Sequence, residues 1–264
     1  MRLVLLGFGA INTRVAALLA QRRTPVQIVG IAVSAQAKAR PPMPPGAELL
    51  TAPDQLAAAR TDLIVEAAGR SAVVAWLPHA LRHAKTTIVA STSAFCDDAF
   101  LDRMRALAET SGSRIVIPSG AIGALDALAA AAILELDEVV HEIVKPPKAW
   151  LGTKAEKAVD LAALRERTIV FDGSAREAAS AYPQNANSTV VTSLAGIGLD
   201  KTVVRLVADP AVTMNGHRII ARGAFGSLEL KLDNNPLATN PKSSELTALS
   251  LVRLIERQLQ PVVV

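Results

Sequence analysis

The hydrophobic positions of the first 120 residues form short continuous runs, separated by segments with helical spacing. Continuous apolar runs are typical of strands buried on both faces of a parallel sheet. They occur at residues 2–7, 26–33, 61–69, 86–92 and 113–118. The segments with helical spacing lie at residues 11–22, 71–85 and 97–112, and a long alanine-rich helix is expected after the last run. This order predicts a doubly wound parallel sheet of five or six strands with helices on both faces.

The pattern changes after about residue 135, where longer segments alternate between apolar and polar positions. A period of two predicts strands of a mixed or antiparallel sheet, here at residues 137–150, 201–209 and 216–234. Helices are expected at residues 174–182, 187–198 and 243–260. The chain is therefore predicted to be an α/β protein with one domain over residues 1–120, a second α/β domain over 121–241, and a terminal helix in 242–264 that packs back on the first domain.

Composition and charge exclude several classes of protein. Half of the 264 residues are hydrophobic and a fifth are charged, which is typical of a packed α/β protein. The net charge is +4, but no run of Lys or Arg exceeds two residues, so no nucleic-acid partner is expected. The longest apolar stretch is too short to cross a bilayer, and a strand beginning near Leu3 leaves no room for a signal peptide. The single cysteine, Cys96, excludes an internal disulfide and favours the cytoplasm.

The first apolar run ends in the sequence GFGAIN, residues 7–12, directly before a helical segment. Gly7 permits a tight turn from strand to helix, and Gly9 lets a pyrophosphate approach the backbone. The helix that starts near Ala10 and Ile11 offers backbone N–H groups and a positive dipole end to the phosphates. This context predicts a Rossmann-type dinucleotide site; the alternative is a tight turn that binds nothing.

Three further positions are expected to belong to this cofactor site. Asn12 replaces the usual third glycine. Its side-chain amide is expected to donate a hydrogen bond to a phosphate or to the nicotinamide side of the cofactor. The turn at Ala68 and Gly69 follows the third long apolar run and is expected to line the same cofactor.

Ser34 stands where an acidic residue would bind the adenosine ribose. Because serine is uncharged, it would not repel the 2′-phosphate of NADP. Lys38 and Arg40 follow within a proline-rich surface loop. The expected cofactor is therefore NAD or NADP, with these residues favouring NADP. In the alternative interpretation, Ser34 only caps a turn and the two cations are solvated.

Residues 118–128, 182–190, 209–219 and 234–250, in this order after the glycine turn, resemble the L-aspartate dehydrogenase family over essentially the whole chain. The resemblance implies a Rossmann domain that binds NAD(P), a second α/β domain that closes over the nicotinamide, and a homodimer. It implies oxidative deamination of L-aspartate through iminoaspartate to oxaloacetate and ammonia, or delivery of iminoaspartate to NAD biosynthesis.

The same resemblance assigns roles to three residues. The nicotinamide-side contacts of the family fall on Ala121 and Asn187, and its catalytic histidine falls on His217. Oxidation of an amino acid requires a base for the amine and for the attacking water, and a histidine that titrates near neutrality is the natural group. From the loop composition alone, a surface histidine at a turn is the alternative for His217.

Two substrate carboxylates require cations or N–H donors. Lys242, Ser243 and Ser244 lie where the last helix is expected to start, near Ser243 or Ser244, and are predicted to bind the substrate. The alternative is ordinary capping of that helix. Lys145 is a second candidate cation.

Other suggestive residues are interpreted structurally, and no metal site is predicted. His79 and His83 have metal-ligand spacing, but no third ligand accompanies them, so a solvated helix face is expected. Acidic neighbours argue against a reactive Cys96, and Glu66 is expected to hydrogen-bond a loop. Two further functions stay open: an imine reductase or dehydrogenase for another amino acid or dicarboxylate, and a dinucleotide sensor without turnover.

Overall fold

The computed structural model describes residues 1–34, 42–183 and 185–263. The described chain divides into two compact units, the first formed by Met1–Gly120 and Thr247–Val264 and the second by Ala121–Leu246. The first unit thus takes up both ends of the chain.

The first unit is built on a six-stranded sheet in which every pairing is parallel, in the order β3-β2-β1-β4-β5-β6. The strands are β1 (Arg2–Leu6), β2 (Gln27–Ala32), β3 (Glu48–Leu50), β4 (Leu63–Glu66), β5 (Thr86–Val89) and β6 (Arg114–Val116). This confirms the predicted doubly wound sheet. The three-residue β3 was not predicted, because it follows the proline-rich segment and is too short to show a periodic pattern.

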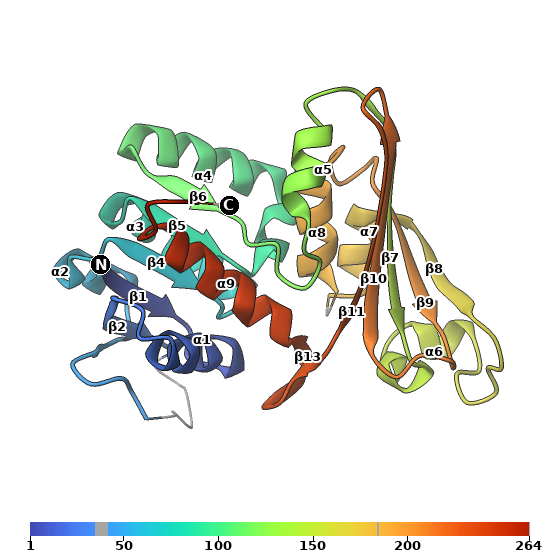
Figure 1. Ribbon diagram of the computed structural model, residues 1–264, viewed down its shortest axis with the longest axis horizontal. Helices are drawn as coiled ribbons and strands as arrows, with labels where there is room; N and C mark the ends of the chain where they lie inside the picture. Colours follow the sequence, from blue (N-terminus) through green and yellow to red (C-terminus); the bar gives the residue numbers. More distant parts are fainter. Residues whose placement is uncertain (35–41, 184, 264) are drawn as a thin grey trace. The chain divides into compact units, whose positions relative to one another are not determined.

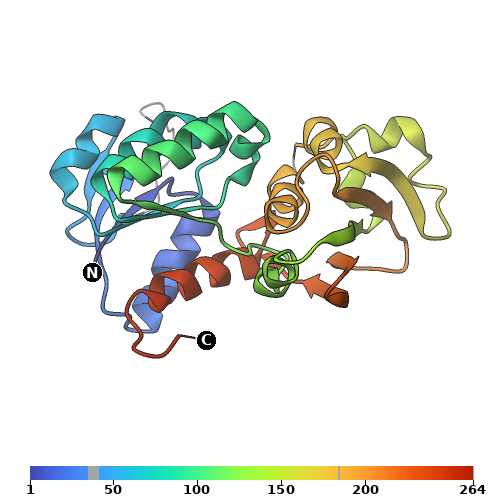
Figure 2. The same ribbon diagram turned by 90° about the horizontal axis from the view of Figure 1, so that it is seen from above.

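Helices cover both faces of this sheet, as its doubly buried strands require (Figures 1 and 2). They are α1 (Ala10–Gln21), α2 (Leu56–Ala59), α3 (Arg70–His83), α4 (Asp98–Ser111) and α9 (Glu245–Arg257), with short turns η1 (Pro53–Gln55) and η2 (Thr92–Cys96). On one face, Val15 of α1 and Leu251 of α9 pack against Leu3 and Leu5 of β1. On the other face, Val4 and its neighbours pack against α2 and α3.

The terminal helix is also held by polar contacts within the first unit. Glu256 accepts hydrogen bonds from Arg22 Nε at 2.7 Å and Nη2 at 2.9 Å, and from the Thr24 hydroxyl at 2.8 Å. The Arg22 side chain is about half exposed, so this pair adds less to stability than the apolar face of the helix.

The second unit contains a five-stranded mixed sheet in the order β11-β10-β7-β9-β8. Its strands are β7 (Leu136–Lys145), β8 (Thr168–Ser174), β9 (Val203–Ala208), β10 (Asn215–Gly223) and β11 (Gly226–Asn234), and a small pair is formed by β12 (Pro236–Leu237) and β13 (Asn240–Ser244). The helical segments are α5 (Leu125–Ala131), η3 (Pro147–Trp150), α6 (Ala155–Ala158), α7 (Ala175–Ala181) and α8 (Ala186–Ala195). The predicted mixed sheet is confirmed.

One helix prediction was wrong in length. The alanine-rich segment forms only the seven residues of α5, and the chain then turns into β7 with Ile133 83% exposed. Alanine has a high helix propensity, but α5 buries only Leu128 and Ala131, so propensity alone does not extend the helix.

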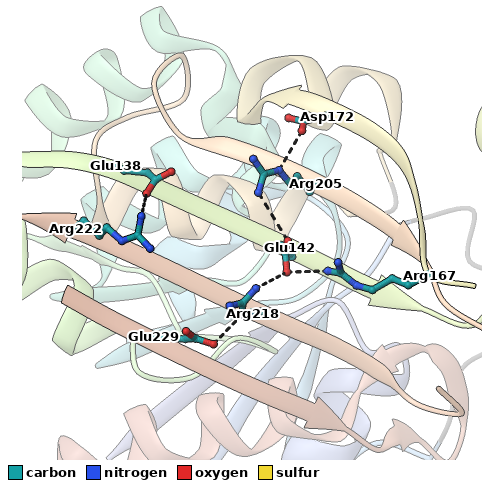
Figure 3. A network of polar contacts seen from close by, with 8 residues as sticks. All are labelled: Glu138, Glu142, Arg167, Asp172, Arg205, Arg218, Arg222 and Glu229. Carbon is teal, nitrogen blue, oxygen red and sulfur yellow. Dashed lines mark hydrogen bonds and ion pairs between the residues drawn. The ribbon is translucent and has the colours of Figure 1, made fainter. Parts of the chain in front are cut away.

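The two faces of the second sheet differ in chemistry. On β10, His217 and Ile219 are buried on the face that α8 covers, whereas Arg218 points to the opposite face. On that opposite face Glu142 is only 5% exposed, and it contacts Arg167 at 2.9 Å, Arg218 at 3.3 Å and Arg205 at 3.9 Å (Figure 3). Three cations thus compensate one nearly buried carboxylate.

Candidate active site

The glycine turn after β1 has the geometry that dinucleotide binding requires. Gly7 has φ +83°, and a Cβ there would lie 2.7 Å from Ala68 Cα, so only glycine fits. Gly9 has φ −83° and no described heavy atom within 4 Å of a built Cβ. The backbone conformation of Gly9 would therefore tolerate a side chain. Because glycine has none, the space beside the start of the helix stays open.

This open space is part of a cavity of about 360 Å³ in the first unit. Its lining includes Gly7, Phe8, Gly9, Ser34, Ala68, Ser71 and Trp76. The first turn of α1 has no side-chain cap hydrogen bond and no acidic residue, and Gly9, which precedes it, lines the cavity. The positive end of the helix dipole is therefore not compensated by the helix itself. The residues present fit a dinucleotide: Gly7 and Gly9 would hold the pyrophosphate, and Ser34 would lie on the ribose side.

Asn12 has a different role from the one predicted. Its side chain is fully buried, and Nδ2 donates to Leu6 O at 3.0 Å and to Gly7 O at 2.8 Å. Both amide hydrogens are therefore used within the turn, and donation to a phosphate or to the nicotinamide is ruled out in this conformation. Asn12 compensates for the absent third glycine by tying α1 to the end of β1.

Glu66 organises the second turn of the cofactor site, as predicted. Its carboxylate accepts from the N–H groups of Ala68 at 2.7 Å and Gly69 at 2.9 Å, and from the Ser91 N–H and hydroxyl. Burial raises the pKa of this carboxyl, and these hydrogen bonds oppose the rise. Ala68 lines the cavity, and Gly69 takes φ +124° at the start of α3.

The structure places Ser34 in the cavity lining, two residues after the end of β2. Lys38 and Arg40, which favoured NADP, lie outside the described residues. The choice between the two dinucleotides therefore remains a prediction.

His217 is buried in the second unit rather than exposed at a turn, so the surface-histidine alternative was wrong. Its Nδ1 lies 2.9 Å from His141 Nε2, and the Nδ1 atom of His141 lies 2.9 Å from the Thr192 hydroxyl. His217 comes from β10, His141 from β7 and Thr192 from α8, so sheet and helix together fix this chain of three side chains. Within the described part of the chain, His217 Nε2 has no hydrogen-bond partner.

The histidine does not titrate near neutrality, which corrects the expectation from the sequence. Burial, and then the charge of Lys145, lower the pKa of His217 to about 3. Burial, and then His217, lower the pKa of His141 well below its usual value. At neutral pH both imidazoles are therefore uncharged, and a free imidazole nitrogen acts as a lone-pair base.

Lys145, the second candidate cation, is close enough to His217 for its charge to be felt there. Its Nζ donates to Asn185 Oδ1 at 2.6 Å and lies 5.1 Å from the centre of the Trp150 ring. Burial lowers the pKa of Lys145 to about 8, so the side chain is mostly charged at neutral pH. A cation beside a histidine suits an anionic substrate.

The two positions assigned to the nicotinamide side differ in their surroundings. The Ala121 carbonyl accepts a hydrogen bond from Asn234 Nδ2 at 2.8 Å, which fixes the backbone there. Asn187 is exposed in the first turn of α8, whereas Asn185, two residues earlier, is buried and holds Lys145.

The residues predicted to bind a substrate carboxylate lie directly before the last helix. Ser243 and Ser244 belong to β13, and α9 starts only at Glu245. The Ser244 hydroxyl accepts from Leu246 N at 3.2 Å, and Ser243 accepts from Asn240. These bonds fit the capping alternative, and nothing is described of the Lys242 side chain.

Sequence reasoning missed His141, Asn185 and Thr192. His141 occupies an inward position of an alternating strand, two residues before Ile143, and a histidine at such a position is a usable signal. Asn185 and Thr192 carry no signal, because only the packing of α8 on the sheet brings them to Lys145 and His141.

Comparison with known proteins agrees with both units. A family described as Aspartate dehydrogenase, C-terminal, matches residues 126–258, and one described as Homoserine dehydrogenase, NAD binding domain, matches residues 7–118. The chain is 51% identical over 262 residues to the L-aspartate dehydrogenase of Brucella anthropi, with 99% of this chain and 98% of that protein covered. It is 47% identical over 196 residues to that of Pseudomonas aeruginosa, covering 74% and 73%.

Solved structures give the same result. The aspartate dehydrogenase of Thermotoga maritima superposes with a TM-score of 0.79 at 28% identity, covering 100% of this chain and 99% of that one. An archaeal homoserine dehydrogenase in complex with NADPH, at 10% identity and a TM-score of 0.61, shares the fold alone. The fold and the two matched families define a two-domain oxidoreductase that uses NAD or NADP. Within that class, the chain belongs to the L-aspartate dehydrogenase family.

Among the described residues, no helix is long and apolar enough to span a bilayer. The same residues contain no group of three or more His, Cys, Asp or Glu side chains that would hold a metal ion.

Proposed function

We propose that this protein oxidises L-aspartate, with NAD or NADP and water, to oxaloacetate, ammonia and the reduced dinucleotide. The hydride leaves Cα while the amine nitrogen forms a double bond to Cα, which gives iminoaspartate. Water then adds to the imine and ammonia leaves. The bound dinucleotide supplies the hydride acceptor.

The observation that carries the proposal is the buried His217, with one ring nitrogen tied to His141 and the other not bonded to any described residue. The substrate ammonium must lose a proton before the hydride leaves, and the attacking water must lose another. His217 Nε2 would accept the ammonium proton and release it to solvent once the hydride has left. It would then accept the proton of the attacking water and return it to the departing amine.

Lys145 would bind a substrate carboxylate. Its ammonium lowers the pKa of His217 in the free protein, and a carboxylate bound to it offsets that charge. Substrate binding therefore raises the basicity of His217 at the stage when a proton has to be accepted. This coupling requires a carboxylate on the substrate, which L-aspartate provides.

The test is the absorbance of the reduced nicotinamide, with purified protein, L-aspartate and either NAD or NADP, against a panel of other amino acids. We expect the signal to grow with L-aspartate, and more strongly with NADP if Ser34 acts as predicted. If another amino acid is oxidised and L-aspartate is not, the substrate assignment is wrong. If no amino acid is oxidised but the dinucleotide still binds, a sensor function is favoured.

The histidine is tested with His217→Ala. We expect kcat to fall by about 10²–10⁴-fold, the usual contribution of a general base, while NAD(P)H binding measured by fluorescence is retained. Unchanged turnover in this variant would remove His217 from the mechanism.

Three broader features belong to the same proposal. The family resemblance supports a homodimer, which light scattering would detect as twice the mass of one chain. The single cysteine supports a cytoplasmic location. Delivery of iminoaspartate to NAD biosynthesis is the proposed alternative use of the imine.

A further inference from the structure

We propose that His141 and Thr192 are positioning residues that hold His217 in the tautomer with hydrogen on Nδ1 and the lone pair on Nε2. This inference deepens the proposed function and rests on it for the catalytic role of His217. The tautomer itself is a property of the free protein.

The direction of the first hydrogen bond follows from the Thr192 hydroxyl. This hydroxyl has one hydrogen and lies 3.1 Å from the Ser188 carbonyl, which can only accept. The hydrogen is therefore used on Ser188 O, and the hydroxyl oxygen is left to accept from His141 Nδ1 at 2.9 Å. His141 thus carries its hydrogen on Nδ1.

The second bond is then determined. His141 is fully buried and its pKa lies well below the usual value, so the ring is neutral and holds one hydrogen only. Its Nε2 is an acceptor, and it lies 2.9 Å from His217 Nδ1. His217 must donate from Nδ1, which leaves Nε2 unprotonated.

This arrangement prepares His217 for proton transfer without rearrangement. When Nε2 accepts a proton, the Nδ1–H bond to His141 stays in place and becomes charge-assisted. The proton does not travel further, because the chain of bonds ends at a backbone carbonyl. His141 therefore orients the base and is not itself a base.

The tautomer is measured on ¹⁵N-histidine-labelled protein by long-range ¹H–¹⁵N correlation at neutral pH, with His217→Gln to assign the signals. We expect a pyridine-type Nε2 and a pyrrole-type Nδ1 for His217, and Thr192→Val should mix the two tautomers. Thr189→Val is the matched control, because among the described residues the Thr189 hydroxyl bonds the backbone carbonyls of Asn185 and Ala186 and no histidine. A protonated Nε2 in the wild-type protein overturns the proposal.

Activity separates positioning from simple packing. His141→Gln keeps an amide oxygen near the Nε2 position as an acceptor, whereas His141→Asn keeps a group only near Nδ1. We expect kcat to fall by about 100-fold in H141N and by less than about tenfold in H141Q, with KM changed little in either. Equal losses in both variants, with NAD(P)H binding retained, would overturn the role of the acceptor.

The two failures are distinguishable. If the tautomer is as stated but no amino acid is oxidised, the proposed function fails and the structural inference stands. If L-aspartate is oxidised but His217 carries its hydrogen on Nε2, the inference fails and the proposed function stands.

Discussion

One ammonium group controls the protonation of His217 at the residue scale. Lys145 is held by Asn185 and Trp150, and its charge disfavours a second charge on the imidazole. Lys145→Met should therefore raise the pKa of His217 above about 3, measured by NMR titration of the ring signals. The same change should lower kcat/KM for L-aspartate by about tenfold or more, because a charge-assisted carboxylate contact is lost.

Lys148→Met is the matched control for this prediction, since Lys148 lies exposed three residues further along the chain. Its substitution should leave the pKa of His217 unchanged. An equal shift in both variants would show that general charge, and not the position of Lys145, sets the pKa.

Asn12 shows what a motif cannot predict at the same scale. The sequence identifies the missing glycine but not the direction in which the amide points. Nδ2 donates to the carbonyls of Leu6 and Gly7 at the end of β1, and the Leu6 carbonyl also accepts from Ala67 N at 3.0 Å. A buried amide group has to find such partners. The predicted contact with the cofactor was wrong because Nδ2 already donates to two backbone carbonyls of the turn.

At the scale of elements, the two glycines of the first turn are needed for different reasons, Gly7 for folding and Gly9 for cofactor binding. Gly7 is required by the fold, because its φ is +83° and a Cβ would meet the Ala68 backbone. Gly7→Ala should lower the free energy of unfolding by about 2 kcal/mol or more in urea titrations. Gly9 has ordinary φ and open space, so Gly9→Ala should change stability by less than about 1 kcal/mol.

The second half of this prediction concerns binding. A methyl group at Gly9 enters the space beside the α1 N-terminus, so NAD(P)H affinity in Gly9→Ala should fall about tenfold or more in fluorescence titrations. A stable Gly9→Ala protein with unchanged affinity would place the pyrophosphate elsewhere.

Elements with strong periodicity were predictable, and elements set by tertiary contacts were not. The buried strands β1, β4 and β5 and the amphipathic α4 and α9 follow directly from their patterns. The length of α5 depends on neighbouring chain segments and was predicted wrongly, whereas α9 starts at Glu245, next to the predicted position. In the site, His217 was found by resemblance, while its partners His141 and Thr192 required the register of β7, β10 and α8.

At the scale of the whole molecule, the buried histidines make stability depend on pH. In the unfolded chain an imidazole binds a proton near pH 6.5, but in the folded protein His217 does so only near pH 3 and His141 well below its usual value. Between these values the unfolded state holds more protons, so the free energy of unfolding falls as the pH falls. The stability that neutral burial provides is fully present above about pH 6.5 and is lost progressively below it.

The measurement is urea unfolding at pH 7 and pH 5. We expect about 2 kcal/mol less stability at pH 5 for each histidine that stays neutral in the fold. His141→Gln/His217→Gln should lose this pH dependence over the same range, whatever its stability at pH 7. Burial raises the pKa of Glu66, so above the ordinary pKa of a carboxyl this residue contributes with the opposite sign and cannot produce the expected loss. Equal pH dependence in the wild type and the double variant would show that the imidazoles are charged in the folded protein, and with a charged His141 the tautomer argument for His217 would fail as well.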